Sequence, residues 1–275
     1  MSAHIRLGFG CGLILLIAFS SQSQAATVFI DDFEGYSDQA AFATSWSMNG
    51  FPPHVLDTTL GRNSSHSIRL VPQASGSGTS NRWYRNLTTP ILPTDANPIL
   101  FSFDFYLDPA GASSNWAADW QLADVRAFSG GAFGSGSLNG IVALSVAYSS
   151  GSFNADTYNG AYFQGRILAP GHTGSTYYSL DALPTAVPRS SGWHTLAARI
   201  GATQTLFLID SLPAEQVNVG ITTPISSVVL GSDVRSIHTF WVDNVQLKQV
   251  PEPNSTWIIA LMLMPVLLYG RHFCG

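Results

Sequence analysis

The chain has 275 residues, of which 45% are hydrophobic, enough for one or two domains with a sizeable core. Only 11% of the residues are Asp, Glu, Lys or Arg, against about a quarter in an average soluble protein. Positions 27 to 249 hold ten basic and sixteen acidic residues. This balance argues against the basic patch that nucleic-acid binding or polybasic membrane contact requires.

The N-terminal residues 1–26 predict a secretory signal peptide that begins with a signal helix. Arg6 precedes the apolar run Cys11–Phe19, and small and polar residues follow as far as the expected cleavage at Ala25 and Ala26. The apolar run is too short for a membrane-spanning helix. We therefore expect the chain to be exported through the inner membrane.

Residues 27–249 predict one all-β domain. In Leu100–Leu107 the phenylalanines occupy alternate positions, which is the period-two pattern of a strand. Similar segments give about a dozen predicted strands, and no convincing amphipathic helix lies between the two ends of the chain. The remaining predicted strands are 27–33, 66–71, 82–87, 120–128, 141–148, 161–168, 193–200, 205–211, 227–230 and 237–248. This pattern favours a two-sheet antiparallel jelly-roll sandwich.

Three segments of this domain are similar to concanavalin A-like and laminin-G-like jelly rolls. They are 30–36, 191–211 and 241–247. The resemblance implies that the Trp193-His194 pair starts a strand and that the following hairpin carries an Asp. It also implies that the strand with the sequence Val-Asp-Asn-Val lies beside the first strand of the domain.

Residues 250–275 resemble a PEP-CTERM sorting signal. Pro251, Glu252 and Pro253 precede the apolar segment 257–270, and Arg271 follows it. The resemblance implies a transient membrane anchor in a Gram-negative bacterium, processing by an exosortase-type enzyme, and display at the cell surface or in an exopolysaccharide matrix. The apolar segment is shorter than the roughly twenty residues that span a bilayer.

Catalytic motifs are missing from the sequence. Residues 26 to 249 contain no cysteine, and no Gly-x-Ser-x-Gly, His-Glu-x-x-His or phosphate-loop motif occurs. Laminarinase-type members of the resembled family carry Glu-x-Asp-x-x-Glu, whereas this chain has only Glu34, Glu215 and Glu252. Glycan hydrolysis needs two carboxyl groups, and an Asp pair such as Asp104 with Asp119 is one way to supply them. We expect the protein not to be an enzyme.

A sugar-binding face is the main functional hypothesis, because sugar rings pack on aromatic side chains while amides, carboxylates and guanidinium groups bind their hydroxyls. On strands taken as neighbours, such residues share the sheet face opposite the Phe101 row, with Trp116 at its rim. The candidate ligand-binding residues are Asp104, Tyr106, Trp120, Tyr148, Tyr162, Gln164 and Arg166. The alternative is that these aromatic side chains belong to the core.

Acidic residues near both ends of the domain suggest one structural calcium ion. Asp31, with the candidate ligands Asp32 and Glu34, lies at the first strand, and Asp243 and Asn244 lie at the last. These oxygen donors converge if the two strands pair, and calcium prefers such clusters. The alternative is that the acids cap turns at strand ends.

The sequence therefore predicts an exported, non-enzymatic protein that binds exopolysaccharide or is embedded in it. Two alternatives stay open at this point. One is a passive structural or adhesion protein without a specific ligand, and the other is a glycan hydrolase or lyase.

Overall fold

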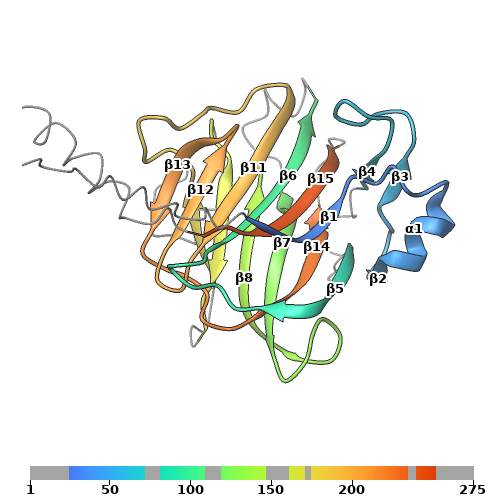
Figure 1. Cartoon of the computed structure of the whole chain (residues 1–275). Coiled ribbons are helices and arrows are strands. Elements are labelled where there is room, and N and C mark those ends of the chain that lie inside the picture. The colour runs from blue at the N-terminus through green and yellow to red at the C-terminus, as the bar shows by residue number, and fades with distance from the viewer. Residues whose placement is uncertain are drawn as a thin grey trace, which may run out of the picture.

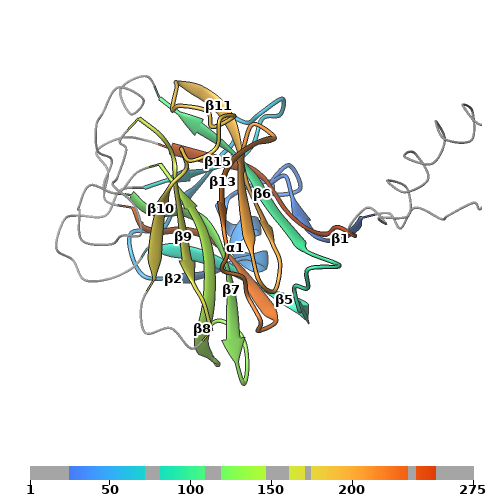
Figure 2. The same ribbon diagram turned by 90° about the vertical axis from the view of Figure 1, so that its left-hand side faces the viewer.

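The computed structural model describes residues 25–71, 81–108, 119–146, 161–170, 175–234 and 240–251, and of 119–121 and 232–234 only the backbone. Two antiparallel sheets face each other in this part of the chain, as Figure 1 shows from the front and Figure 2 from the side. The predicted two-sheet sandwich is confirmed.

Sheet A has eight strands and sheet B has seven. In spatial order, sheet A contains β13 (Leu212–Val217), β12 (Thr205–Ile209), β11 (Gly192–Ile200), β6 (Ile99–Leu107), β15 (Phe240–Gln249), β4 (Ser67–Leu70) and β3 (Val55–Asp57), and β1 (Ala26–Asp31) pairs with β15. Sheet B contains β10 (Thr176–Ser179), β9 (Gln164–Leu168), β8 (Ser137–Ser145), β7 (Asp119–Ser129), β14 (Ile225–Val234), β5 (Arg82–Ile91) and β2 (Ser47–Asn49).

The first and last strands of the domain pair as the sequence predicted. Asp31 of β1 lies opposite Val245 of β15, and the two strands run antiparallel. The pairing covers only the C-terminal half of β15, because β4 pairs with residues Phe240 to Val242 of the same strand. The strand that closes the domain therefore contacts β1 and β4 on one side and β6 on the other.

The core lies between the two sheets. Phe101, Phe103, Phe105 and Leu107 of β6 are fully buried, as their alternation predicted. The sheets approach closely at Gly165 of β9, where an added Cβ atom would lie 2.7 Å from the ring of Phe207 in β12. Glycine at this position therefore sets how near β9 comes to sheet A.

One short helix, α1 (Gln39–Ser45), corrects the expectation that no helix lies between the two ends. Asp38 caps it, because its side chain accepts a hydrogen bond from the backbone N–H of Ala41 over 2.8 Å. Phe42 is the one residue of the helix that is buried, stacked against Trp46. A helix of two turns with a single core residue has too little periodicity to be predicted. The strands β2, β3, β10 and β13 were also missed.

The two predicted processing segments lie almost wholly outside the described residues. Ala25 and Ala26 lie at the start of the described chain and Pro251 at its end, while Glu252, Pro253 and Arg271 lie beyond it. Within the described ranges, no helix has the length and apolar character needed to cross a membrane.

Candidate functional site

The predicted single ligand-binding face is wrong, because its residues lie on two different sheets. Asp104 and Tyr106 belong to β6 of sheet A, whereas Gln164 and Arg166 belong to β9 of sheet B. The neighbours of β6 are β11 and β15, strands from the later part of the chain, and not β7. The chain crosses to the other sheet after β6, so consecutive strands are not spatial neighbours there.

The other predicted members of this face are only partly described. Trp120 lies in β7 of sheet B, but its side chain is outside the described residues, as are Tyr148 and Trp116 entirely. Tyr162 precedes β9 and is half-buried. Asp119, the suggested hydrolytic partner of Asp104, also lies in β7, so the two residues are on strands of different sheets.

An aromatic row crosses the outer face of sheet A, which is the face turned away from sheet B. Trp193 of β11 and Trp241 of β15 both lie opposite Tyr106 of β6. The ring centroid of Tyr106 is 5.4 Å from that of Trp193 and 5.5 Å from that of Trp241, and both pairs meet edge to face. All three side chains are partly exposed. Of the aromatic residues predicted to bind a ligand, Tyr106 belongs to this row, and its neighbours there are Trp193 and Trp241.

The two tryptophans of the row had a signal in the sequence. Leu196, Ala198 and Ile200 alternate as buried residues of β11, so Trp193 falls on the opposite face. The same reasoning applies to Trp241, which precedes the buried Val242. Only the strand order, however, places both beside Tyr106.

Asp104 is the centre of a hydrogen-bond network beside the aromatic row. Its Oδ1 accepts hydrogen bonds from Arg62 Nη1 over 2.5 Å and from Thr195 Oγ1 over 2.6 Å. Its Oδ2 accepts one from Asn244 Nδ2 over 2.9 Å. The side chain of Arg62 is 31% exposed and that of Asp104 is 13% exposed. The row is therefore bordered by a charge-compensated polar patch that still reaches solvent.

Asp57 fixes one end of the aromatic row. The indole N–H of Trp241 donates to Asp57 Oδ2 over 2.8 Å. Burial favours a higher pKa for the Asp57 carboxyl, but hydrogen bonds from Thr59 and Trp241 outweigh it and hold the pKa below its ordinary value. The ionised Asp57 carboxylate thus restrains the indole ring of Trp241.

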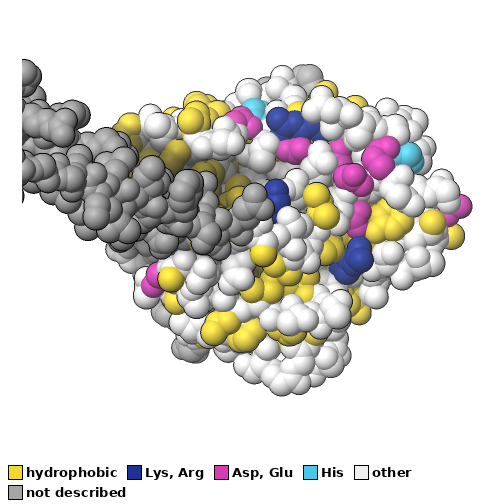
Figure 3. Space-filling model, viewed as in Figure 1, with side chains coloured by type: hydrophobic (Ala, Val, Ile, Leu, Met, Phe, Trp, Pro, Cys, Tyr) yellow, Lys and Arg dark blue, Asp and Glu magenta, His cyan; other side chains and the backbone are white. Residues whose placement is uncertain are grey.

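Figure 3 views this face and shows acidic and basic side chains close together around β6, β15 and β4.

Asp243, a predicted calcium ligand, is fully buried beside Asp104. Its Oδ2 accepts hydrogen bonds from the backbone N–H of Arg62 over 2.7 Å and from Ser64 Oγ over 3.1 Å. Its Oδ1 accepts one from the backbone N–H of Asn244 over 2.7 Å. The carboxylate therefore anchors the loop between β3 and β4 to β15.

Glu34, a second predicted ligand, binds the same loop. Its Oε1 accepts hydrogen bonds from the backbone N–H groups of Ser65 and His66, and its Oε2 accepts one from Ser65 Oγ and lies 3.1 Å from His66 Nδ1. Asp32 is exposed, and among the described residues it accepts one hydrogen bond, from the backbone N–H of Glu34 over 3.2 Å. Within the described residues, no group of three or more His, Cys, Asp or Glu side chains is arranged to hold a metal ion. Calcium binding stays a prediction, and it would have to displace these donors.

Asp31 is a hydrogen-bonding centre that links several elements of the fold, a role that the sequence analysis did not predict. This buried carboxylate accepts hydrogen bonds from Tyr36 Oη over 2.6 Å and Trp46 Nε1 over 2.9 Å, and Arg85 Nη1 lies 3.2 Å away. Its other oxygen accepts the backbone N–H of Phe33. Asp31 therefore ties β1 to residues on either side of α1 and to β5 of the opposite sheet.

Gln164 and Arg166 lie together on the outer face of sheet B. Arg166 Nε donates to Ser175 Oγ over 2.8 Å, and its guanidinium group lies 5.4 Å from the ring centroid of Tyr177. Gln164 lies opposite Ser179, and the Oε1 and Oγ atoms of the two are buried without a hydrogen-bond partner among the described residues. This face is polar, with Gln164 and Ser179 buried and Arg166 partly exposed.

His194 lies between a serine and an aspartate. Its Nδ1 is 2.8 Å from Asp210 Oδ2, and its Nε2 is 2.9 Å from the carbonyl oxygen of Ser190 and 3.1 Å from Ser190 Oγ. The contacts therefore hold the turn before β11 against the hairpin that follows it.

Comparisons with known proteins relate the chain to others through its fold. The chain matches no protein-family model and has no significant match among curated proteins. Among solved structures it is similar to the globular domain of T. cruzi calreticulin, with 11% identity, a TM-score of 0.47, and coverage of 81% of this chain and 87% of that one. An endo-1,3-beta-glucanase from Streptomyces sioyaensis gives 13% identity, a TM-score of 0.48, and coverage of 84% and 99%. The metal-free carbohydrate recognition domain of Emp46p gives 10% identity, a TM-score of 0.43, and coverage of 82% and 95%. At these values the likeness concerns the fold alone.

Proposed function

We propose that the domain binds a glycan at the aromatic row of Tyr106, Trp193 and Trp241. The observation that carries this proposal is that the three partly exposed rings lie side by side on the outer face of sheet A, next to a hydrogen-bonding patch. Aromatic faces bind the C–H surfaces of sugar rings, and polar groups at their border select the hydroxyl pattern.

The arrangement favours binding because its parts are already held in place. The indole of Trp241 is fixed by Asp57, and the guanidinium of Arg62 is fixed by Asp104 and Thr195. Side chains that are ordered before binding lose less conformational entropy when a ligand arrives. The row therefore supplies a preformed surface for a sugar.

We propose binding without cleavage. Glycoside hydrolysis needs an acid and a base or nucleophile on either side of the scissile bond. Of the neighbouring carboxyl groups, Asp243 is fully buried under the loop it anchors, and Asp104 accepts three hydrogen bonds from protein donors. The alternative of a glycan hydrolase or lyase is tested by incubating bound glycans with the protein, where release of new reducing ends would support it.

The sequence supports a further part of the proposal, that the glycan is an exopolysaccharide outside the cell. Export and display rest on the predicted signal peptide and on the resemblance of residues 250–275 to a PEP-CTERM signal. The proposed partners are thus an exosortase-type enzyme and the extracellular polysaccharide of a Gram-negative bacterium.

Variants of the aromatic row test the proposal. We expect Trp193→Ala and Trp241→Ala each to weaken binding on a glycan array, and in titrations with the best ligand, by at least about tenfold, which equals about 1.4 kcal/mol. Phe51, which is 71% exposed, provides a matched control because Phe51→Ala removes an exposed aromatic ring outside the row. Melting curves of each variant show whether the fold is retained. If the natural protein bound no glycan, the passive structural alternative would be favoured. Equal glycan binding by all variants would instead show that the glycan binds away from the aromatic row.

A further inference from the structure

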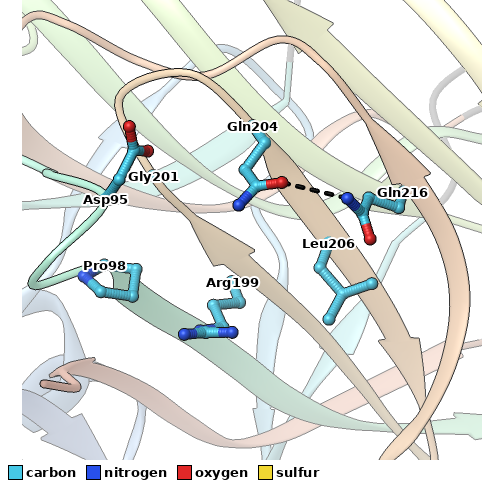
Figure 4. Close-up of a pocket in the computed structure, with 7 residues that line it drawn as sticks. All are labelled: Asp95, Pro98, Arg199, Gly201, Gln204, Leu206 and Gln216. Atoms are coloured by element: carbon cyan, nitrogen blue, oxygen red, sulfur yellow. Dashed lines mark hydrogen bonds between the residues drawn. The ribbon is translucent and has the colours of Figure 1, made fainter. Parts of the chain in front are cut away.

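A pocket of about 100 Å³ opens on the outer face of sheet A, away from the aromatic row. Arg199 of β11, Leu206 of β12 and Gln216 of β13 line it from the sheet, as Figure 4 shows. Gln204, Asp95 and Pro98 complete its wall from the adjoining loops. Neither the candidate ligand-binding residues predicted from the sequence nor the proposed glycan site includes this pocket.

The pocket and the aromatic row share one strand face. Trp193, Thr195, Ala197 and Arg199 occupy alternate positions of β11 and therefore point to the same side of sheet A. Trp193 and Arg199 are six residue steps apart along the strand, which corresponds to about 20 Å at the rise of a β-strand. This is the length of a short oligosaccharide, so one extended ligand reaches both places.

Small side chains lie between the two places, where the buried Ala197 of β11 lies opposite Ser102 of β6. Arg62 and Thr195, nearer the aromatic row, contribute polar groups that are already held by Asp104. A chain that lies along β11 therefore meets polar contacts before it reaches the pocket.

The pocket offers both kinds of contact that a sugar uses. Gln216 Nε2 donates to Gln204 Oε1 over 3.0 Å, and this bond leaves the Gln204 amide N–H groups and Gln216 Oε1 to face a ligand. Leu206 and Pro98 add apolar surface. Asp95 accepts hydrogen bonds from Thr203 N–H and Oγ1 over 3.1 and 2.9 Å, which fixes the rim of the pocket.

We propose that this pocket is a second subsite for the same glycan, so that sheet A binds an internal stretch of a linear polysaccharide along β11. The inference rests on the proposed function, because the aromatic row supplies the first subsite. It adds the class of ligand: an extended chain that spans both subsites, and not a single sugar or a chain end.

The inference is tested with a series of linear oligosaccharides of increasing length, starting at the disaccharide. They are cut from the polysaccharide that binds the intact protein most strongly. For the natural protein we expect affinity to rise with length by at least about tenfold until the chain spans both subsites, because the second contact is then intramolecular. The double variant Gln204→Ala, Gln216→Ala should lose this rise and keep the natural affinity for the shortest ligands that bind. Trp193→Ala should weaken binding at every length.

The outcomes separate the two proposals. The second subsite would be overturned if affinity rose with ligand length as much in the double glutamine variant as in the natural protein. It would also be overturned if the affinity of the natural protein did not rise beyond that for the shortest ligands that bind. If no oligosaccharide and no parent polysaccharide binds the natural protein, the proposed function fails and the second subsite fails with it. Melting curves of the double variant confirm that the fold is intact, and both glutamines are exposed side chains.

Discussion

Asp104 of β6 and Asp243 of β15 lie directly opposite each other in sheet A, but only Asp104 receives a guanidinium group. Asp243 is bound by neutral donors from the loop that covers it. Burial is the main cause that raises the pKa of Asp243, and the nearby charge of Asp104 adds to it, although hydrogen bonds from Arg62, Asn244 and Ser64 oppose the shift. Asp243 therefore resists ionisation, because burial raises its pKa more than its hydrogen bonds lower it.

The raised pKa of Asp243 predicts a stability cost at higher pH. A group whose pKa is higher in the folded than in the unfolded chain stabilises the fold below its unfolded pKa, about 3.9 for Asp, and loses this contribution as the pH rises through the folded value. Asp243→Asn removes the titration. We expect the melting temperature of Asp243→Asn, relative to that of the natural protein, to be higher at pH 7 than at pH 3. Parallel melting-temperature curves over this range would contradict the assignment.

Glu34 predicts the opposite slope. Burial favours a higher pKa for its carboxyl, but hydrogen bonds from His66 and Ser65 outweigh it and lower the pKa to about 2. A lowered folded pKa stabilises the protein above the unfolded value of about 4.3 and loses that contribution as the pH falls through the folded value. We expect Glu34→Gln to lose less melting temperature than the natural protein as the pH falls below about 4.3. The side chain is 36% exposed, so solvent screening keeps the effect small. Asp32→Asn is the control, and an acid side as steep in Glu34→Gln as in this control would argue against the assignment.

Asp31 and Asp32 form a matched pair of neighbouring carboxylates with different burial. Asp31→Ala leaves Tyr36, Trp46 and Arg85 without their shared acceptor, and we expect it to lower the free energy of unfolding by about 3 kcal/mol. Asp32→Ala removes one exposed contact and should change it by less than about 0.5 kcal/mol. Chemical denaturation of both variants measures the difference. Similar values for the two would show that the Asp31 network does not join the sheets as described.

Gly165 predicts a packing effect between the sheets. Its substitution by Ala places a Cβ atom against the ring of Phe207, so Phe207 or the strand must shift. We expect Gly165→Ala to destabilise the protein by about 1–3 kcal/mol. Gly35→Ala is the control, because a Cβ atom there meets nothing within 4 Å. If the two variants melt at the same temperature, the close approach of β9 to β12 is not a constraint on stability.

Patterns that depend on neighbouring residues were readable from the sequence. The alternation in 100–107 identified β6 and its buried phenylalanines, and the resemblance of the closing Val-Asp-Asn-Val segment placed β15 beside β1. The elements that were missed are short: β2 and β3 have three residues each, and α1 has seven. In such short segments, caps and tertiary contacts decide the structure more than periodicity does.

The sequence by itself determined which side of β6 faces the core, because side chains alternate along any pleated strand whatever its neighbours are. Only the tertiary structure decided which exposed sides lie together. Tyr106 and Arg166 were predicted to share one face of a sheet. The chain instead enters sheet B after β6, and β6 pairs with strands that come much later in the sequence. Strand order depends on contacts between distant parts of the chain, which local alternation does not encode. For this reason Trp193 and Trp241, and not Gln164 and Arg166, lie beside Tyr106.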